Sequence, residues 1–378
     1  MVKTTKILKI NPTNPEPELI EEAVAVIKSG GLVAFPTETV YGLGANAFDQ
    51  GAIKKIYETK GRESDNPLII HIASEHEIDN VAKNPSPKDK TYMEEFWPGP
   101  LTLILKKHEK IPYNVTSGLE TVAVRCPKHP VAKALIKSAG PIAAPSANIS
   151  GKPSPTNAQH VINDLFGKVD IIIDGGPCTV GLESTIVDAN QKLILRPGSI
   201  TDVHLSDFGA VKIKLNLDPE NNQQTPTSPG QKHKHYAPNA KTTLVIGTKE
   251  KSIEKINELI NSAQSAQNIG ILTTDESLNG YIDSKVTLVS LGKEGDPIGI
   301  AANLYNCLRL FDQPENNHIE QIYIQGHFNN YGLYLPILDR LVRASNYDII
   351  AIEKQPGEYV SPPVNACQPG KRKKRSFM

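Results

Sequence analysis

The residues in this sequence that are best suited to chemistry are cations and small hydroxyl side chains that follow short apolar runs. Few carboxylates stand at these turns, and neither a Ser-His-Asp order nor a metal-ligand cluster can be placed by spacing. This set of side chains binds anions. Nucleotidyl and phosphoryl transfer mainly require that positioned Lys and Arg residues, with Mg²⁺ bridging phosphate oxygens, neutralise a polyphosphate. The cations are Lys60, Arg62, Arg125 and Arg196, and the hydroxyls are Thr37, Thr39, Ser146, Ser184 and Thr185.

Three other site patterns fit this sequence less well. The sequence has no GxxxxGK[ST] motif, which excludes a P-loop. Residues 42–47 match GxGxxA, but they follow a PTET segment instead of joining a strand directly to a helix, so the dinucleotide motif is weak. Cys126 follows Arg125 directly and could be a nucleophile. However, spacing places no histidine partner for it, and a buried cysteine is commonly a small hydrophobic residue.

The elements that would position these side chains begin with an apolar run at residues 32–35, which has the length of a strand. Residues 37–44 follow without clear periodicity and predict a loop. Apolar residues at helical spacing then predict a helix over residues 51–58. This helix would present Lys60 and Arg62 at its end.

Further short apolar runs also carry or end at polar residues. When several strand ends meet at one edge of a sheet, such residues line a single cleft, and the alternative is a set of unrelated surface turns. His71 either points into a site or is a satisfied core residue, and Trp97 is either a packing anchor or a substrate contact. The runs and their polar residues are 68–72 with His71, 121–124 with Arg125, 142–144 with Ser146, 181–188 with Ser184, and 193–195 with Arg196.

Length and composition limit the class of protein. A chain of 378 residues with 39% hydrophobic residues exceeds the size of one hydrophobic core, so two domains are expected. The 41 basic and 41 acidic residues cancel, so no overall charge directs the protein to nucleic acid or to an anionic membrane. Four scattered cysteines, no apolar leader and no apolar run of membrane-spanning length predict a soluble, cytoplasmic protein with reduced thiols.

The sequence predicts two α/β domains joined by a linker. Alternating strand and helix patterns predict a first domain over residues 1–217 and a smaller, Rossmann-like domain over residues 241–355. Residues 218–240 are polar and rich in Pro, Asn and Gln, as in a linker, although their KHKHY segment adds positive charge and an aromatic ring. The basic tail, residues 356–378, is expected to be disordered.

A series of motifs occurs in one order along the chain. They are PTETVYGLG, KGR with NPLIIH, WPGPLT, VRCP, APSANISG, STIVD, RPGSI and KHKHYAP. As a set they resemble the threonylcarbamoyl-AMP synthase family, and GLYLPILDRLVRAS resembles the additional C-terminal domain of its two-domain members. The resemblance covers nearly the whole chain, except the stretch from Gly357 onward. It implies a YrdC-like twisted mixed sheet with flanking helices, a second Rossmann-like α/β domain, and a linker that forms a lid.

The resemblance also implies a reaction. L-threonine, bicarbonate and ATP would give threonylcarbamoyl-AMP and pyrophosphate, with Mg²⁺ carried by the ATP phosphates and no metal ligand from the protein. The product would pass to the tRNA threonylcarbamoyl-transfer machinery as the first step of a tRNA modification. Lys60 and Arg62 would be catalytic, by electrostatic stabilisation. The residues implied for threonine are Thr39, His71, Arg125, Ser184 and the backbone at Ala144, and those implied for ATP are Lys60, Arg62, Asn66, Thr121, Ser146, Ser154, Arg196 and Tyr236.

The implied chemistry agrees with the residues at hand. A carbamate of threonine falls apart in water, so its site must be closed and dry, and a lid made from KHKHYAP would exclude water and add positive charge. No side chain is an obvious general base. Arg125 would hold the carboxylate of threonine as a fork.

Two rival interpretations remain. One is an RNA-binding module of YrdC-like fold without adenylation activity, which the basic tail favours and the zero net charge opposes, so direct tRNA binding stays open. The other is the carbamoyl-transfer maturation proteins, which embed a similar domain. Those proteins also carry Cys-rich zinc fingers, which four scattered cysteines exclude.

Overall fold

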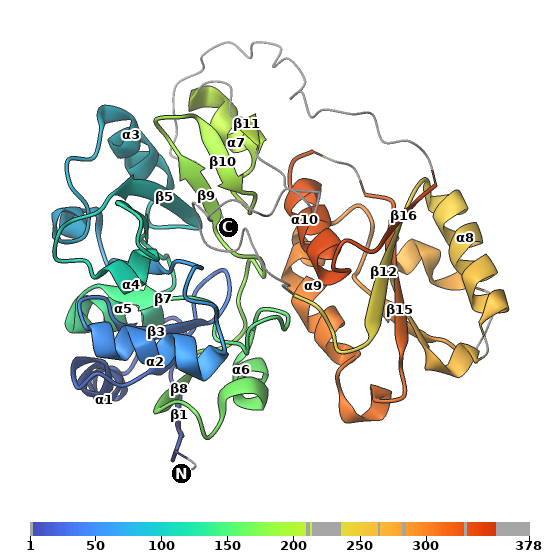
Figure 1. Ribbon diagram of the computed structural model, residues 1–378, viewed down its shortest axis with the longest axis horizontal. Coiled ribbons are helices and arrows are strands. Elements are labelled where there is room, and N and C mark those ends of the chain that lie inside the picture. The colour runs from blue at the N-terminus through green and yellow to red at the C-terminus, as the bar shows by residue number, and fades with distance from the viewer. Residues whose placement is uncertain are drawn as a thin grey trace.

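The computed structural model describes residues 3–208, 212–213, 236–263, 265–281, 285–328 and 331–352. Within these ranges the chain forms two α/β units, coloured blue to green and yellow to red in Figure 1. Most of the predicted lid, including the KHKH segment, and the whole basic tail lie outside the described residues. Tyr236, at the end of that segment, is described.

The first unit is built on one mixed sheet. Its strands lie in the order β1-β8-β2-β3-β7-β4-β6-β5-β9-β10-β11. The sheet contains parallel pairs, such as β4 with β6, and antiparallel pairs, such as β5 with β6, which confirms the predicted mixed sheet. The strands are β1 (Lys6–Lys9), β2 (Val33–Phe35), β3 (Gly42–Asn46), β4 (Ile69–His71), β5 (Leu101–Lys106), β6 (Thr121–Arg125), β7 (Ile142–Ala144), β8 (Ile171–Asp174), β9 (Thr185–Asp188), β10 (Leu193–Arg196) and β11 (Lys212–Ile213).

Helices pack against both faces of this sheet, because two apolar clusters form on opposite sides of its strands. Helix α1 buries Ile20, Ala23, Val24 and Ile27 in a cluster that also contains residues of α5, while α2, α3 and α6 contribute to a larger cluster. The helices are α1 (Pro17–Lys28), α2 (Gln50–Lys60), α3 (Pro87–Phe96), α4 (Tyr113–Thr116), α5 (Pro130–Ala139), α6 (Ala158–Leu165) and α7 (Asp202–Leu205), with short 3₁₀ helices η1 (Glu75–Asn80) and η2 (Ser206–Phe208).

The prediction of a loop over residues 37–44 is wrong at its C-terminal end. Strand β3 begins at Gly42 and pairs antiparallel with both β2 and β7. The strand lacks the β-branched residues that usually identify one, because its neighbours leave no room for them. A Cβ on Gly44 would lie 2.8 Å from both Phe35 and Ile142. The GxGxxA match therefore reflects close packing of strands and forms no phosphate loop.

The second unit is a parallel sheet with helices on both faces, which confirms the predicted Rossmann-like domain. The strand order is β14-β13-β15-β12-β16. Helices α9 and α10 lie on the side that faces the first unit, and α8 lies on the far side (Figure 1). The strands are β12 (Lys241–Ile246), β13 (Ile269–Thr273), β14 (Thr287–Ser290), β15 (Gln321–Gly326) and β16 (Ile349–Ala351), and the helices are α8 (Lys249–Ser262), α9 (Pro297–Leu310) and α10 (Tyr334–Ala344), with 3₁₀ helices η4 (Ala266–Asn268), η5 (Asp275–Gly280) and η6 (Pro314–Asn316).

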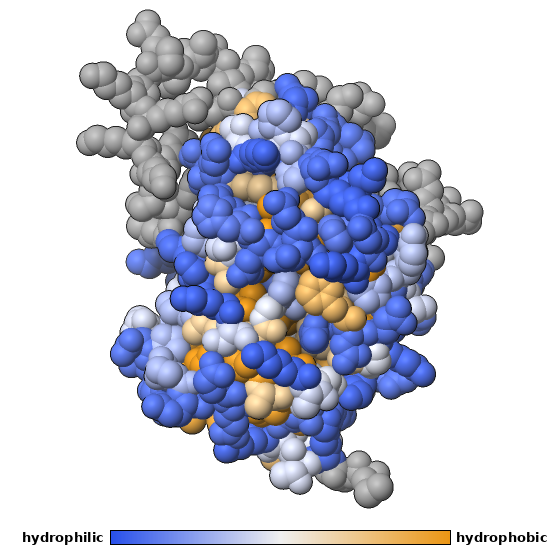
Figure 2. Space-filling view, turned by 90° about the vertical axis from the view of Figure 1, so that its left-hand side faces the viewer, coloured by the Kyte–Doolittle hydropathy of each residue, from blue (hydrophilic) through white to orange (hydrophobic). Residues whose placement is uncertain are grey.

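The surface of the first unit is mainly hydrophilic on the face that Figure 2 shows, with hydrophobic residues visible in areas between the polar ones. Among the helices of the described ranges, none has both the length and the apolar character needed to cross a bilayer.

Candidate functional site

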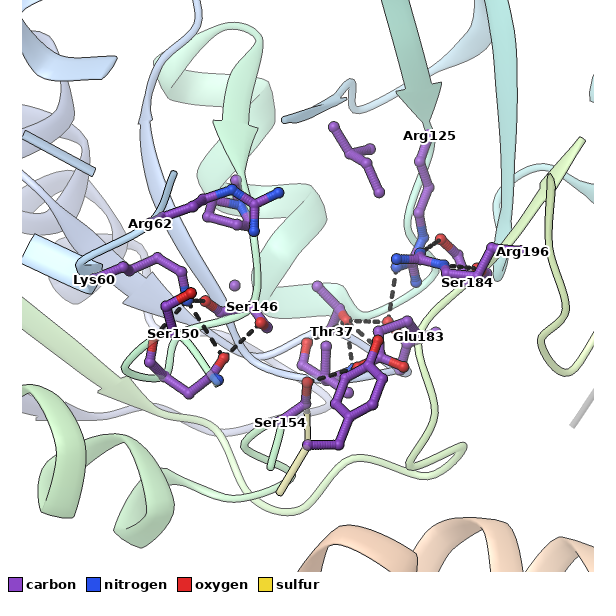
Figure 3. A pocket seen from close by; sticks show the side chains of 18 of the residues that line it. Thr37, Lys60, Arg62, Arg125, Ser146, Ser150, Ser154, Glu183, Ser184 and Arg196 are labelled. Atoms are coloured by element: carbon purple, nitrogen blue, oxygen red, sulfur yellow. Dashed lines mark hydrogen bonds between the residues drawn. The ribbon is translucent and has the colours of Figure 1, made fainter. Parts of the chain in front are cut away.

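One cavity in the first unit is lined by the ends of several strands and loops (Figure 3). Lys60 and Arg62 lie on one side of it, and Arg125 and Arg196 lie on the other. This arrangement confirms that the cationic strand ends share one hollow. Three of the site residues expected from the sequence, Asn66, Thr121 and Thr185, do not line the cavity; those lining it are Thr37, Thr39, Lys60, Arg62, His71, Arg125, Ala144, Ser146, Ser154, Ser184, Arg196 and Tyr236.

Helix α2 delivers Lys60 to the cavity as its last residue. Gly61 follows in the left-handed conformation, with φ of 60°, and ends the helix. Lys60 is only 2% exposed, and its ammonium donates to the carbonyl oxygen of Ser146 at 2.5 Å and to that of Asn148. Burial lowers the pKa of Lys60. Lys60 therefore ties α2 to the loop that follows β7.

Arg62 is half-buried on the same side of the cavity. Its Nε donates to the carbonyl oxygen of Asn66 at 3.0 Å, and its Nη2 donates to that of Pro67 at 2.9 Å. Desolvation lowers the pKa of Arg62 to about 10, so the guanidinium stays charged at neutral pH. Asn66 does not line the cavity, but its carbonyl oxygen helps to orient Arg62.

Thr121 is not brought into the cavity. It is the first residue of β6, whereas Arg125 is the last, and at about 3.3 Å per residue the two are roughly 13 Å apart along the strand. The exposed Thr121 lies instead beside a smaller hollow, which shares Pro67 with the main cavity.

Arg125 is held in place by three oxygens in different directions. Nη2 donates to Oε1 of Glu38 at 2.5 Å, Nη1 to Oγ1 of Thr39 at 2.7 Å, and Nε to the carbonyl oxygen of Gly99 at 3.2 Å. Sequence reasoning missed Glu38, although it stands inside the PTETV motif, because no spacing rule pairs it with a residue so far along the chain. The buried ion pair fixes the plane of the guanidinium.

His71 faces the cavity from the end of β4 as a neutral base. Burial and the charge of Arg125 lower its pKa to about 3. Its Nδ1 has no hydrogen-bond partner, and its ring meets Phe35 edge-on at 6.1 Å between centroids. His71 lines the cavity, which favours a site residue over a satisfied core residue.

Ser184 and Arg196 form the wall opposite Lys60. Arg196 donates from Nε to the carbonyl oxygen of Ser184 at 3.0 Å and from Nη2 to its Oγ at 3.1 Å. The hydroxyl of Ser184 also contacts Oγ1 of Thr102 at 2.7 Å. The antiparallel pairing of β9 with β10 brings these residues together.

Glu183 is a second residue that sequence reasoning missed. Its buried carboxylate lines the cavity and accepts a hydrogen bond from Ser154 at 2.6 Å. Its other partners, Tyr305 and Arg340, belong to the second unit. No sequence pattern relates residues this far apart.

An apolar strip continues from the cavity along the same face of the sheet. Side chains alternate along a strand, so Ile69 shares a face with His71, and Ala123 shares one with Arg125. Ile69 and Ala123 belong to one buried apolar cluster with Ile186 and Leu195, against which Ile104 and Leu193 pack.

Cys126 and Trp97, the two other candidates, are buried residues of the fold. Burial raises the pKa of the Cys126 thiol to about 12, and Cys126 does not line the cavity. Trp97 is buried, and its Nε1 donates to the carbonyl oxygen of Leu101 at 2.8 Å, so it is a packing anchor.

The cavity wall offers no obvious metal site. Among its described lining residues Glu183 is the only carboxylate, and that carboxylate already accepts bonds from Ser154, Tyr305 and Arg340. Within the described ranges no group of three or more His, Cys, Asp or Glu side chains could hold a metal ion.

Both units of the chain match known protein families. Residues 25–198 match a family model described as telomere recombination, and residues 199–346 match one described as the C-terminal domain of threonylcarbamoyl-AMP synthase. The chain is 44% identical to a threonylcarbamoyl-AMP synthase of Bacillus subtilis, over 88% of this chain and 94% of the relative. It is 43% identical to the threonylcarbamoyl-AMP synthase of Pyrococcus abyssi, over 89% of this chain and 98% of the relative. The crystal structure of P. abyssi Sua5 complexed with L-threonine superposes with a TM-score of 0.84 at 41% identity, covering 92% of this chain and 99% of that one.

Proposed function

The chain belongs to the threonylcarbamoyl-AMP synthase family, and on this premise we propose that its cavity joins L-threonine and bicarbonate to the AMP part of ATP, with release of pyrophosphate. The chain is an enzyme of the nucleotidyltransferase type that forms threonylcarbamoyl-AMP, and L-threonine is a substrate. ATP, bicarbonate and the role of each residue belong to the proposal.

Threonine binds at the end of the cavity formed by Arg125, His71, Thr39, Ser184 and the backbone of Ala144. A guanidinium has five N–H donors, of which Arg125 uses one on each nitrogen for its three oxygens. One donor on each terminal nitrogen is left, which matches the two oxygens of a carboxylate. The position of His71 in the lining supports a polar contact with the same substrate.

ATP binds across the remaining wall. Arg62 and Arg196 stand on opposite sides of the cavity and neutralise the phosphates, while Ser146 and Ser154 offer hydroxyls. Ile69, which also lines the cavity, offers the adenine ring an apolar contact. Mg²⁺ would reach the cavity on the phosphate oxygens, as part of the substrate.

The first role of Lys60 is structural. Its ammonium is committed to the loop that carries Ser146 and Asn148, so it holds that loop in position and adds positive charge close to the phosphates. Arg62 contributes charge directly. Both act by electrostatic preorganisation, which is the sense in which we regard them as catalytic.

The reaction requires a closed site. The amine of threonine attacks bicarbonate to form a carbamate and water, and a carbamate oxygen then attacks the α-phosphorus of ATP in line with departing pyrophosphate. Tyr236 lines the cavity and is 6% exposed, which supports its role in excluding water while the carbamate exists.

The observation that carries this proposal is the meeting of Arg125, Arg62, Arg196 and the neutral His71 in one hollow. The test is pyrophosphate release with ATP and Mg²⁺, leaving out threonine or bicarbonate in turn. We expect release only with the complete set. Release that ignores threonine would contradict the proposal, and salt-dependent RNA binding without ATP consumption would favour the RNA-binding alternative instead.

We further propose that the product passes to the tRNA threonylcarbamoyl-transfer machinery and that the enzyme works in the cytoplasm. The buried free thiols of Cys126, Cys178 and Cys307 support a reducing compartment.

A further inference from the structure

The two units meet through a close-packed joint. Leu182 and Val40 of the first unit belong to the same apolar cluster as the core of the second. Gly181 has φ of +77° and lies against α9, where a Cβ would stand 2.4 Å from Cα of Ala302. Both its conformation and this approach require glycine. The second unit is therefore seated directly behind the cavity wall.

Two buried ion pairs cross this joint. Arg309 of α9 lies 2.8 Å from Oδ2 of Asp164, and Nε of Arg340 of α10 lies 2.9 Å from Oε2 of Glu183. Arg309 also donates to the carbonyl oxygen of Pro153, next to Ser154. A shift of the two surfaces that separated either pair would leave a buried charge without its partner, so the pairs favour this alignment.

The carboxylate of Glu183 is the point where the second unit reaches the cavity. It accepts from Tyr305 at 2.8 Å and from Arg340 at 2.9 Å on one side, and from the hydroxyl of Ser154 at 2.6 Å on the other. Ser154 and Glu183 both line the cavity, whereas Tyr305 and Arg340 do not.

The same two residues support Tyr236. Its ring packs against the ring of Tyr305 at 5.2 Å between centroids, and the guanidinium of Arg340 lies 5.7 Å from its centre. Tyr236 itself has a positive φ of 66°, an uncommon conformation that surrounding contacts must hold.

Glu183 is unsuited to act as a base. Burial would raise its pKa, but Arg340, Arg196 and the hydroxyl of Ser154 together lower it to about 2. Its oxygens are occupied by donors from three residues. A carboxylate in this state orients its neighbours.

We propose that Tyr305 and Arg340, both in the C-terminal domain, are positioning residues for ATP: through the carboxylate of Glu183 they orient Ser154, and through ring contacts they hold Tyr236 over the cavity. This inference rests on the proposed function in that it assigns Ser154 and Tyr236 to ATP. The second unit is then a structural part of the ATP site.

Tyr305→Phe is the sharpest test, because it keeps the ring against Tyr236 and removes only the hydroxyl that binds Glu183. We expect the KM for ATP to rise about tenfold, as loss of a hydrogen bond to a charged group predicts, while the KM for threonine changes little. Tyr281→Phe is the matched control, since it removes another tyrosine hydroxyl bond of the second unit, which goes to Thr273 and not to Glu183. In a Ser154→Ala background, Tyr305→Phe should add little.

Arg340 gives an independent comparison. Arg340→Gln should raise the KM for ATP, and Arg340→Lys, which keeps the charge beside Glu183, should restore part of the loss. Equal KM values for the wild type and Tyr305→Phe, or the same change in Tyr281→Phe, would overturn the inference.

Hydrogen exchange separates this inference from the proposed function. With no substrate added, Tyr305→Phe should speed exchange in residues 151–156 relative to both the wild type and Tyr281→Phe. Wild-type protein that releases no pyrophosphate would refute the proposed function alone. Unchanged exchange in residues 151–156 would refute the positioning role, whatever the activity.

Discussion

Replacing Arg125 with lysine separates the threonine end of the cavity from the ATP end. The guanidinium reaches three oxygens, on Glu38, Thr39 and Gly99, at distances of 2.5 to 3.2 Å. A lysine ammonium keeps the charge beside Glu38, but it is a single point that cannot span those oxygens and also present two donors to a carboxylate. The variant thus loses the fork and keeps the cation.

The expected effect is specific to one substrate. Loss of one charge-assisted hydrogen bond to threonine, about 1.5–3 kcal/mol, raises the KM for threonine roughly 10- to 100-fold. The KM for ATP should change little. Stability should fall less than for Arg125→Ala, which leaves the Glu38 carboxylate buried and unpaired at a cost of about 3–5 kcal/mol.

The assay is pyrophosphate release, titrating threonine at saturating ATP and then ATP at saturating threonine, with thermal unfolding as the folding control. Arg62→Lys is the matched variant on the opposite side of the cavity and should raise the KM for ATP instead. If both variants raise the same KM, or if Arg125→Lys leaves the KM for threonine unchanged, the assignment of the two ends is wrong.

Three further changes test other parts of the account. Lys60→Ala should lower kcat/KM by about 10²-fold or more, because the loop carrying Ser146 loses its anchor and the phosphates lose a cation; near wild-type pyrophosphate release would remove that role. His71 has a folded pKa of about 3, below its unfolded value, so the unfolded chain binds the extra proton as the pH falls. The free energy of unfolding should therefore fall between about pH 6.5 and pH 3, by up to about 1.4 kcal/mol per pH unit. Denaturant unfolding should show a flatter pH dependence for His71→Asn than for the wild type, and identical slopes would contradict this. Cutting the chain before Gln231 should leave the first domain folded by circular dichroism but impair turnover, since it removes Tyr236 and the second unit, and equal activity of the shortened chain would count against the lid.

The site depends on contacts that the helices and strands alone do not reveal. Glu38 stands inside the PTETVYGLG motif and Glu183 directly precedes STIVD, yet neither was expected to matter, because their partners lie far along the chain. Asn66 and Thr121 illustrate the reverse case. Asn66 opens the NPLIIH motif and Thr121 stands shortly before VRCP, but neither residue lines the cavity.

The sequence by itself determined the order of most helices and strands and the residue types at the strand ends, because these follow from hydrophobic periodicity and turn chemistry within short windows. It did not reveal β3, where close packing selects glycine over β-branched residues, or the edge strands β1 and β16. Only the tertiary structure decided that Lys60 holds a loop, that His71 is neutral, and that Tyr305 and Arg340 reach the site through Glu183. Burial and long-range pairing set these properties, and both exist only after the strands and the two units have come together.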